Sequence, residues 1–264
     1  MVRAYSPVTI VLIETDHAFP GKGRNLAIEE ASSDWLACID GGIIPHPDWL
    51  LELVKVKERQ PEAQVIYGRY EPIIHDYFTE CAAITYLPSP GTLTPFIASC
   101  LLHRSAWKTV GGFREDLRSG EDRLFFRTVE GARVRTANSE KAVVYWSLQP
   151  SISGTFRRFS AYSRYGMKAG LASEWQVSVS RFYLFMIGML LAGFLWRPLF
   201  LTPVLLLWLR AELRIRRWYR QQPARRLWKE LLNPKRVLMV IWISTVIDLA
   251  MFQGMWHWLA RREP

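Results

Sequence analysis

The C-terminal third of the chain limits most strongly what the chain can fold into. Residues 182–209 are almost wholly apolar, but Arg197-Pro198 interrupts them. A single membrane span needs about 20 residues, so this run is generous for one helix and short for two full ones. A second apolar stretch covers residues 237–259. The sequence therefore predicts a membrane-associated helical tail over residues 181–264.

The charge distribution supports a membrane partner for this tail. The net charge of the chain is +10, and residues 181–264 hold 14 basic against 4 acidic side chains, so the whole excess lies there. Because these basic residues alternate with apolar runs and tryptophans, they favour anionic lipid head groups over nucleic acid as the partner. The basic segment 210–236 is expected to be a loop in the cytoplasm by the positive-inside rule.

The side of the membrane on which residues 210–236 lie decides whether the apolar residues 182–209 cross the membrane or turn back. If the rest of the chain is also cytoplasmic, both ends of residues 182–209 lie on one side of the membrane. That arrangement favours a hairpin or kinked helix turning near Arg197-Pro198 over a straight span. Asp248 lies near the centre of the next helix, at 237–259. It faces either protein or water, or the helix lies in the membrane interface.

Residues 1–175 read as one α/β domain of alternating strands and helices, which predicts a mainly parallel sheet. The predicted strands cover residues 8–13, 35–40, 64–69, 96–103 and 133–146, and the predicted helices cover residues 25–33, 48–59, 76–84, 105–110, 122–130 and 153–171. Asp48 is the expected N-cap of the second helix. The three cysteines have no metal-binding spacing and suit a reducing compartment.

A buried-type strand at 35–39 ends in a carboxylate, Asp40, followed by Gly41-Gly42. In open α/β sheets, ligands bind beyond the carboxyl ends of the strands. Asp40 is therefore a candidate for contact with a nucleotide ribose or a divalent ion, and a simple turn after the strand is the alternative. Chelation normally needs a second oxygen ligand close by, and Gly42 removes the obvious one.

A second acidic motif, Ser119-Gly120-Glu121-Asp122, begins a predicted helix. Ser-x-x-Asp is a variant of the capping box, so the motif is also explained as a helix start. The two interpretations are compatible, because a carboxylate fixed at a helix start is well placed to take a proton from an acceptor hydroxyl. Asp122 is the better candidate for this base, with Glu121 beside it.

Other polar and aromatic residues are weaker candidates. Arg24 and Asn25 follow two glycines at a helix start, where free N–H groups favour phosphate, but the spacing is not that of a P-loop. A predicted helix before the tail carries cations that suit a diphosphate or lipid head group, or that simply snorkel at the membrane edge: Arg157, Arg158, Arg164 (beside Tyr165) and Lys168. Trp146 either stacks on a sugar or packs in the core.

Several short motifs occur together in a fixed order. They are Gly23-Arg24-Asn25-Leu26-Ala27 with Ala31, Cys38-Ile39-Asp40-Gly41-Gly42 with Pro45 and Trp49-Leu50, and Val110-Gly111-Gly112-Phe113 with Gly120-Glu121-Asp122. Together with Val144-Tyr145-Trp146 and the Arg158 to Gly166 stretch, this order resembles the inverting family 2 glycosyltransferases of the GT-A fold, which carry C-terminal membrane helices. The resemblance implies a Rossmann-like α/β fold with a mixed sheet, shortened at its N-terminus. The resemblance covers residues 8–170.

The resemblance implies a site and its ligands. Asp40 corresponds to the first acid of the DXD-like motif that meets the donor's nucleotide diphosphate, and Asp122, next to Glu121, corresponds to the general base. The expected donor site adds Gly41, Arg24 and Asn25, with Mg²⁺ or Mn²⁺ at Asp40, and the expected acceptor or phosphate site holds Trp146, Arg158, Arg164 and Tyr165. The implied partners are a UDP- or GDP-linked sugar, a lipid or polysaccharide acceptor of the cell envelope, and the membrane, with the catalytic domain on the cytoplasmic side.

Two departures from the family pattern leave alternatives open. Gly42 stands in place of the last acid of the DXD triplet. The family's opening strand and helix, which hold the nucleotide base, are expected before residue 8, so the chain resembles the family from about 60 residues in. The alternatives are a non-catalytic membrane adaptor that keeps the acceptor surface, and an export component that binds glycan without chemistry.

Overall fold

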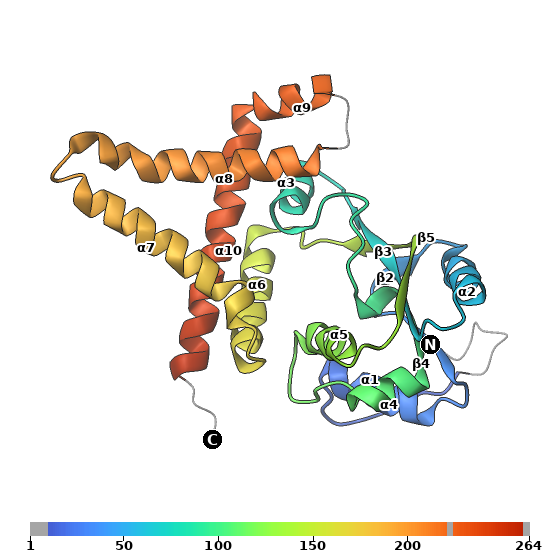
Figure 1. The fold of residues 1–264 in the computed structure, drawn as a ribbon. Coiled ribbons are helices and arrows are strands. Elements are labelled where there is room, and N and C mark those ends of the chain that lie inside the picture. The colour runs from blue at the N-terminus through green and yellow to red at the C-terminus, as the bar shows by residue number, and fades with distance from the viewer. Residues whose placement is uncertain (1–9, 221–223, 261–264) are drawn as a thin grey trace.

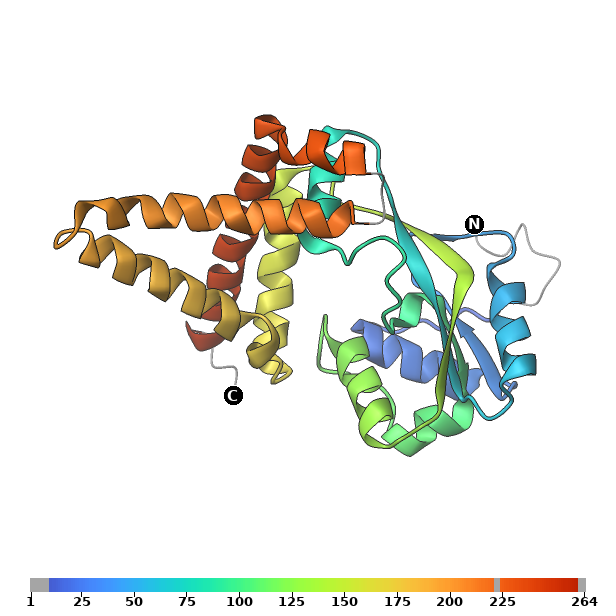
Figure 2. The same ribbon diagram turned by 45° about the horizontal axis from the view of Figure 1, so that its top comes forward.

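The computed structural model of the chain describes residues 10–220 and 224–260. Figures 1 and 2 show two parts lying side by side. One is a sheet with helices on both faces, here called the sheet module (residues 10–147). The other is a set of helices, here called the helical tail (residues 152–260). The segment 10–13, expected as part of a first strand, has no strand in the structure, and residues 8 and 9 lie outside the described part.

The sheet has five strands in the order β1-β4-β3-β5-β2. Their bounds are Trp35–Cys38 for β1, Ile43–Pro45 for β2, Val65–Ile73 for β3, Cys100–His103 for β4 and Thr136–Ser147 for β5. Only β3 and β5 pair in parallel, and the other three pairings are antiparallel. The expected mixed α/β sheet is confirmed, but the expectation of a mainly parallel one is wrong.

The physical reason lies in the connection from β3 to β4. A parallel neighbour requires a crossover that packs back on the sheet. This connection instead contains helix α3 (Tyr77–Tyr86), whose buried side chains pack with those of the helical tail. The chain then returns through a short 3-10 turn at Ile97–Ser99 to enter β4 antiparallel to β3.

The two faces of the sheet are covered by different helices. Helix α2 (Trp49–Arg59) packs on one face, where Ile66 and Leu101 point. Helices α1 (Pro20–Glu30), α4 (Arg104–Val110) and α5 (Glu121–Gly131) cover the other face, where Val65 and Leu102 point. This is the alternation of neighbouring residues in a strand. Asp48 precedes α2 as expected, but its side chain forms no capping hydrogen bond.

Gly68 lies where the register of β3 against β5 shifts. A Cβ atom there would lie 2.1 Å from the Ala142 carbonyl oxygen and 2.4 Å from Ser99 Oγ. We expect Gly68→Ala to lower the free energy of unfolding by about 1–3 kcal/mol, the usual cost of overpacking a core. Chemical denaturation would measure this, with Gly23→Ala as the control because a Cβ at residue 23 meets open space. An unchanged stability of Gly68→Ala would contradict the close approach of these backbones.

The helical tail begins with α6 (Ile152–Lys168) and a 3-10 turn at Ala172–Glu174. Helices α7 (Gln176–Ala192) and α8 (Thr202–Trp218) follow, and a 3-10 turn at Arg197–Leu201 lies between them. The segment 210–236, expected as a loop, is largely helical, because α8 continues into it and α9 (Ala224–Leu231) follows. The chain ends in α10 (Pro234–Ala260), the one helix among the described residues that is long and apolar enough to cross a membrane.

Helix α10 lies along α6 (Figures 1 and 2). Gly254 allows close contact, since a Cβ there would lie 2.3 Å from the Ser160 carbonyl oxygen. Ser163 Oγ donates to the Met251 carbonyl oxygen at 2.8 Å. The carboxylate of Asp248 is 1% exposed and pairs with Arg210 of α8. Of the two alternatives for Asp248, the structure therefore has its side chain facing protein.

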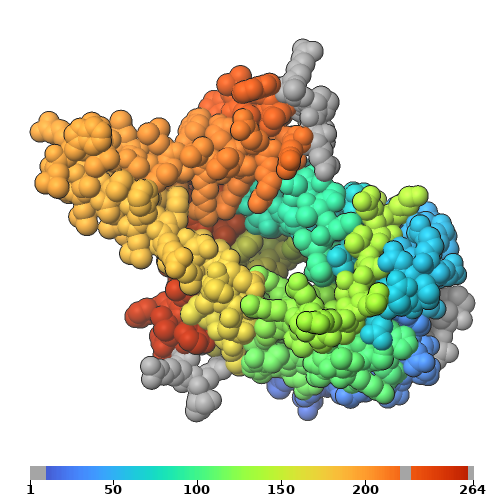
Figure 3. All heavy atoms as spheres, viewed as in Figure 1, coloured from blue at the N-terminus to red at the C-terminus, as the bar shows by residue number. Residues whose placement is uncertain are grey.

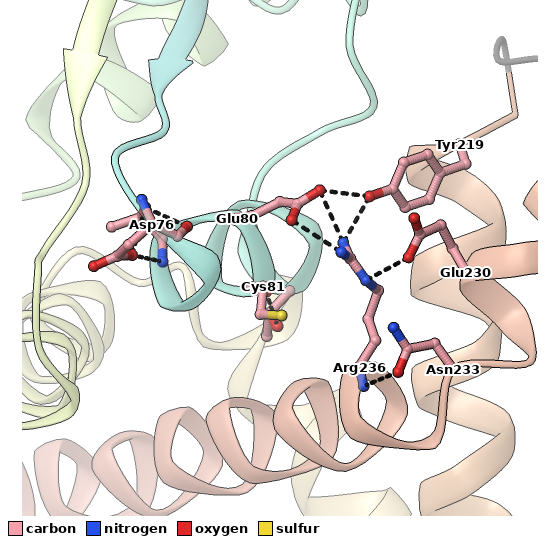
Figure 4. Close-up of polar contacts among 9 residues, drawn as sticks. Asp76, Glu80, Cys81, Tyr219, Glu230, Asn233 and Arg236 are labelled. Carbon is pink, nitrogen blue, oxygen red and sulfur yellow. Dashed lines mark hydrogen bonds and ion pairs between the residues drawn. The ribbon is translucent and has the colours of Figure 1, made fainter. Parts of the chain in front are cut away.

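A buried arginine joins the tail to the sheet module (Figure 4). Arg236, at the start of α10, is 6% exposed. Its guanidinium lies 2.9 Å from Glu80 of α3 and 2.7 Å from Glu230 of α9, and it donates to the hydroxyl of Tyr219 at 2.6 Å. That hydroxyl donates in turn to Glu80 at 2.7 Å. One cation thus connects α3, α9 and α10 with the residue that follows α8.

Candidate active site

Arg24 of α1 brings the two acidic motifs together. Its Nη2 donates to Asp40 Oδ1 at 2.7 Å, and its Nη1 donates to Glu121 Oε1 at 2.5 Å. Asp40 follows β1, and Glu121 is the first residue of α5. The side chain of Asp40 is 44% exposed and that of Glu121 only 5%. Two carboxylates far apart in the sequence therefore share one guanidinium.

The neighbouring acids at the start of α5 have different surroundings. The N-cap is Gly120, with φ +87°, so Ser119 as the cap is wrong, and the helix begins at Glu121, one residue before the predicted start at 122. Burial raises the pKa of Glu121, Asp122 raises it further, and Arg24 opposes both. Asp122 Oδ1 accepts a hydrogen bond from the Arg123 amide at 2.8 Å, in an exposed setting. Glu121 is thus an anchor for Arg24, while Asp122 is open to an incoming group.

A cavity of about 410 Å³ opens where the sheet module meets α6, in the hollowed region of Figure 3. Its lining is strongly cationic and consists of Arg118, Ser119, Gln149, Gly154, Arg157, Arg158, Ala161 and Tyr162. Ser119 Oγ and Arg158 Nη1 are buried without a hydrogen-bond partner in the described part of the chain. Unpaired buried polar atoms are costly, so they favour a bound polar group here.

Tyr162 links this cavity to the acids. Burial raises the pKa of its hydroxyl, Arg158 lowers it, and Asp122, Glu121 and Asp40 all raise it. All three carboxylates are therefore within electrostatic reach of one phenol that lines the cavity. The predicted donor acid and the predicted base lie at one site, next to a cationic hollow.

Asn25, a predicted donor ligand, has an internal role in the structure. Its Nδ2 donates to the Phe113 carbonyl oxygen and to Glu115, each at 2.9 Å. Its Oδ1 accepts from Trp107 Nε1 at 3.0 Å and from the Phe113 amide at 2.9 Å. Because both ends of the amide are engaged, Asn25 holds the loop that follows α4 and leaves ligand contact to Arg24.

Gly41 and Gly42 form the turn between β1 and β2, and Gly42 has φ +84°. A Cβ at Gly41 would meet nothing within 4 Å, so the space beside Asp40 is open. No group of three His, Cys, Asp or Glu side chains that could hold a metal ion occurs within the described residues. Asp40 alone, with one oxygen engaged by Arg24, does not fit a divalent cation site by itself.

The predicted acceptor residues fall into two groups. Trp146 of β5 lies under the guanidinium of Arg158, 5.3 Å from it, and packs edge-on against Tyr70. With the Gln149 amide turned so that its oxygen faces Arg158, that oxygen accepts from Nη2 at 2.7 Å. The ring of Tyr165 instead packs against Phe19 before α1, with Arg164 stacked over it. Only Arg158 of the four lines the cavity.

Sequence reasoning did not select Arg118, Gln149 or Tyr162 as site residues. Tyr162 lies one helical turn after Arg158 on α6, a spacing that places both on the same face. That spacing was a usable signal for Tyr162. Arg118 belongs to an irregular loop, and only the tertiary structure brings it to the cavity.

The family comparison agrees with the motifs. Residues 1–117 match the family model described as Glycosyl transferase family 2. Among solved structures, a crystal structure of S. aureus TarS 1–349 in complex with UDP-GlcNAc is similar, with a TM-score of 0.42 and 17% identity over 92% of this chain and 74% of that one. No curated protein matches the sequence. The part of the chain that is similar to glycosyl transferase family 2 is thus residues 1–117, which contain Arg24 and Asp40.

Proposed function

We propose that the chain transfers a sugar, with inversion, from a nucleotide-sugar donor to a hydroxyl of a lipid-linked or polysaccharide acceptor at the cytoplasmic face of the cell membrane. The observation that carries the proposal is the Arg24 bridge between Asp40 and Glu121. It fixes a residue of the donor-side motif beside the motif that contains the candidate base. The match of residues 1–117 to the glycosyl transferase family 2 model supports the reaction class.

In this proposal Asp122 is the general base. Its carboxylate takes the proton of the acceptor hydroxyl as the acceptor oxygen attacks the anomeric carbon from the face opposite the nucleotide. The bond from that carbon to the diphosphate oxygen breaks, and the nucleoside diphosphate leaves with the bonding electrons. Asp122 suits this role because it is only half-buried, while Glu121 beside it is buried and paired with Arg24. A base at a fixed helix start lies within reach of a bound hydroxyl.

The charges of the site explain why further cations are needed for a diphosphate. Three acidic side chains, Asp40, Glu121 and Asp122, lie at the site, and Arg24 is the cation that pairs with the first two. A diphosphate adjacent to them requires additional positive charge. Arg118, Arg157 and Arg158 line the neighbouring cavity and supply it. Arginine is well suited to this because its planar group binds phosphate oxygens in pairs.

Binding and turnover by two variants test the proposal. A panel of UDP- and GDP-sugars would be titrated calorimetrically into the purified full chain, Asp40→Asn and Asp122→Asn. We expect one donor to bind the native chain, with affinity lowered at least about tenfold by Asp40→Asn, the loss of a charge-assisted contact. Asp122→Asn is expected to keep the affinity and lose turnover. If no donor of the panel binds the native chain, the proposal is wrong and the non-catalytic adaptor is favoured.

A further inference from the structure

Helices α7 and α8 form a projecting hairpin with a very apolar surface. Within residues 184–209, exposed large side chains follow one another along both helices and the turn: Leu184, Phe185, Ile187, Leu190, Leu191, Phe194, Leu195, Trp196, Phe200, Leu201, Val204, Leu205, Trp208 and Leu209. Leu195 is 94% exposed and Phe194 is 80% exposed. Figures 1 and 2 show the hairpin running away from the sheet module and across the direction of α10. Large contiguous apolar patches of this kind mark sites of contact with a membrane or another protein.

We infer that this hairpin enters an anionic bilayer from one side and returns to the same side, and that α10 lies outside the hydrocarbon instead of crossing it. The inference refines the membrane part of the proposed function and does not depend on sugar transfer. In this inference, lipid covers the apolar surface of the hairpin. Among the described residues, only the segment 184–209 enters the membrane.

Charge and shape favour lipid over a second protein copy. Arg197, at the turn, is the one charged residue of 184–209, whereas exposed basic residues flank the segment at Arg181, Arg216 and Arg217. Such cations at the base of an apolar element complement anionic head groups. On α7, the exposed side chains point to more than one side of the helix, because five of them fall within eight residues. Lipid surrounds a helix from all sides, while a partner protein covers one face.

The length of the hairpin fits insertion without crossing. Each arm of the hairpin is about 18–24 Å long at 1.5 Å per residue. The first arm runs from Arg181 to Arg197, and the second runs from the turn to Arg210. The hydrocarbon layer is about 30 Å thick. The tip therefore passes the middle of the bilayer but does not reach the far side in a straight insertion. Arg197 would then extend its guanidinium toward polar head groups, as arginine near an apolar helix end does.

Much of the apolar surface of helix α10 is packed inside the protein, although Leu238, Trp242, Leu249 and Trp256 are more than half exposed. In its most apolar window, 56% is buried. It lies along α6 through Gly254 and Met251, and α6 carries Arg157 and Arg158 at a cavity with a polar lining. If α10 crossed the membrane, α6 would have to take these cations into the hydrocarbon. The pair of Asp248 and Arg210 joins α10 to α8 at the base of the hairpin.

Cysteine labelling in sealed membrane vesicles tests both halves of the inference. In a full chain with Cys38→Ala, the remaining cysteines are buried. Single cysteines would be placed at Lys235→Cys and Leu259→Cys, near the two ends of α10, and at Leu195→Cys at the hairpin tip. Leu51→Cys is the matched control, since Leu51 is a 52% exposed leucine of the sheet module. An impermeant maleimide is the probe, added from the side that labels residue 51.

We expect residues 51, 235 and 259 to label from the same side, and residue 195 to label only after detergent is added. Labelling of 235 and 259 from opposite sides would show that α10 crosses the membrane and would overturn the inference. So would labelling of residue 195 as readily as residue 51. Protection of residue 195 that persists in detergent, with the mass of a dimer, would assign the surface to a second copy instead. None of these outcomes changes donor binding or turnover, so the reaction proposal is tested separately.

Discussion

Asp122→Asn is expected to lower the rate of sugar transfer by a factor of about 10²–10⁴, the contribution that a positioned general base typically makes. The substitution removes the charge and the basicity of the carboxylate but keeps an oxygen that accepts from the Arg123 amide. The start of α5 should therefore remain intact, and the thermal unfolding midpoint should stay within about 2 °C of the native value, as for other exposed substitutions. Initial rates of nucleoside diphosphate release, with the donor identified by calorimetry, would measure the loss.

Asp34→Asn is the matched control, because Asp34 is an exposed carboxylate just before β1 and away from the Arg24 bridge. It should keep the native rate.

A second comparison separates the two acids of the motif. Glu121→Gln is expected to disturb the Arg24 bridge and to change donor affinity along with the rate, whereas Asp122→Asn changes the rate alone. If Asp122→Asn transfers sugar at the native rate, the base is another residue.

The convergence of the two acidic motifs was predictable from the sequence because each motif has a local cause. Asp40 follows the end of a strand and Glu121 begins a helix, and both positions present their side chains at the edge of a sheet. The order of the motifs along the chain then indicated one site. The sequence also indicated Arg24 as a site residue. It was predicted as a phosphate ligand, whereas in the structure it bridges the two carboxylates.

Other features depend on contacts that no local pattern contains. The mainly parallel sheet was a wrong prediction because alternating strands and helices do not show where a helix packs, and α3 packs on the tail instead of the sheet. Asn25 looked like a ligand at a helix start, but its partners lie about 90 residues later in the chain. Tyr162 and Arg118 meet at the cavity only when α6 folds against the sheet module.

The joint between the tail and the sheet module should be the most sensitive point for stability. Arg236→Met is expected to lower the free energy of unfolding by about 3–5 kcal/mol, because breaking a buried ion pair leaves uncompensated charges. Here the substitution removes the cation that Glu80 and Glu230 share, and Tyr219 loses its donor partner. Unfolding of the full chain by denaturant, in one detergent, would measure the loss. Lys235→Met is the control, since Lys235 is the exposed neighbour on the same helix.

A second substitution separates lost charge pairing from lost packing. Adding Glu80→Gln to Arg236→Met removes one of the stranded carboxylates, so the double variant should recover part of the stability that the single variant loses. If it is no more stable than Arg236→Met, the loss comes from packing of the arginine stem and not from its charge.

The joint also supports the site, because α10 holds α6 through Met251 and Gly254, and α6 carries Arg158 and Tyr162. Arg236→Met should therefore weaken donor binding at temperatures below its unfolding transition, and Lys235→Met should not.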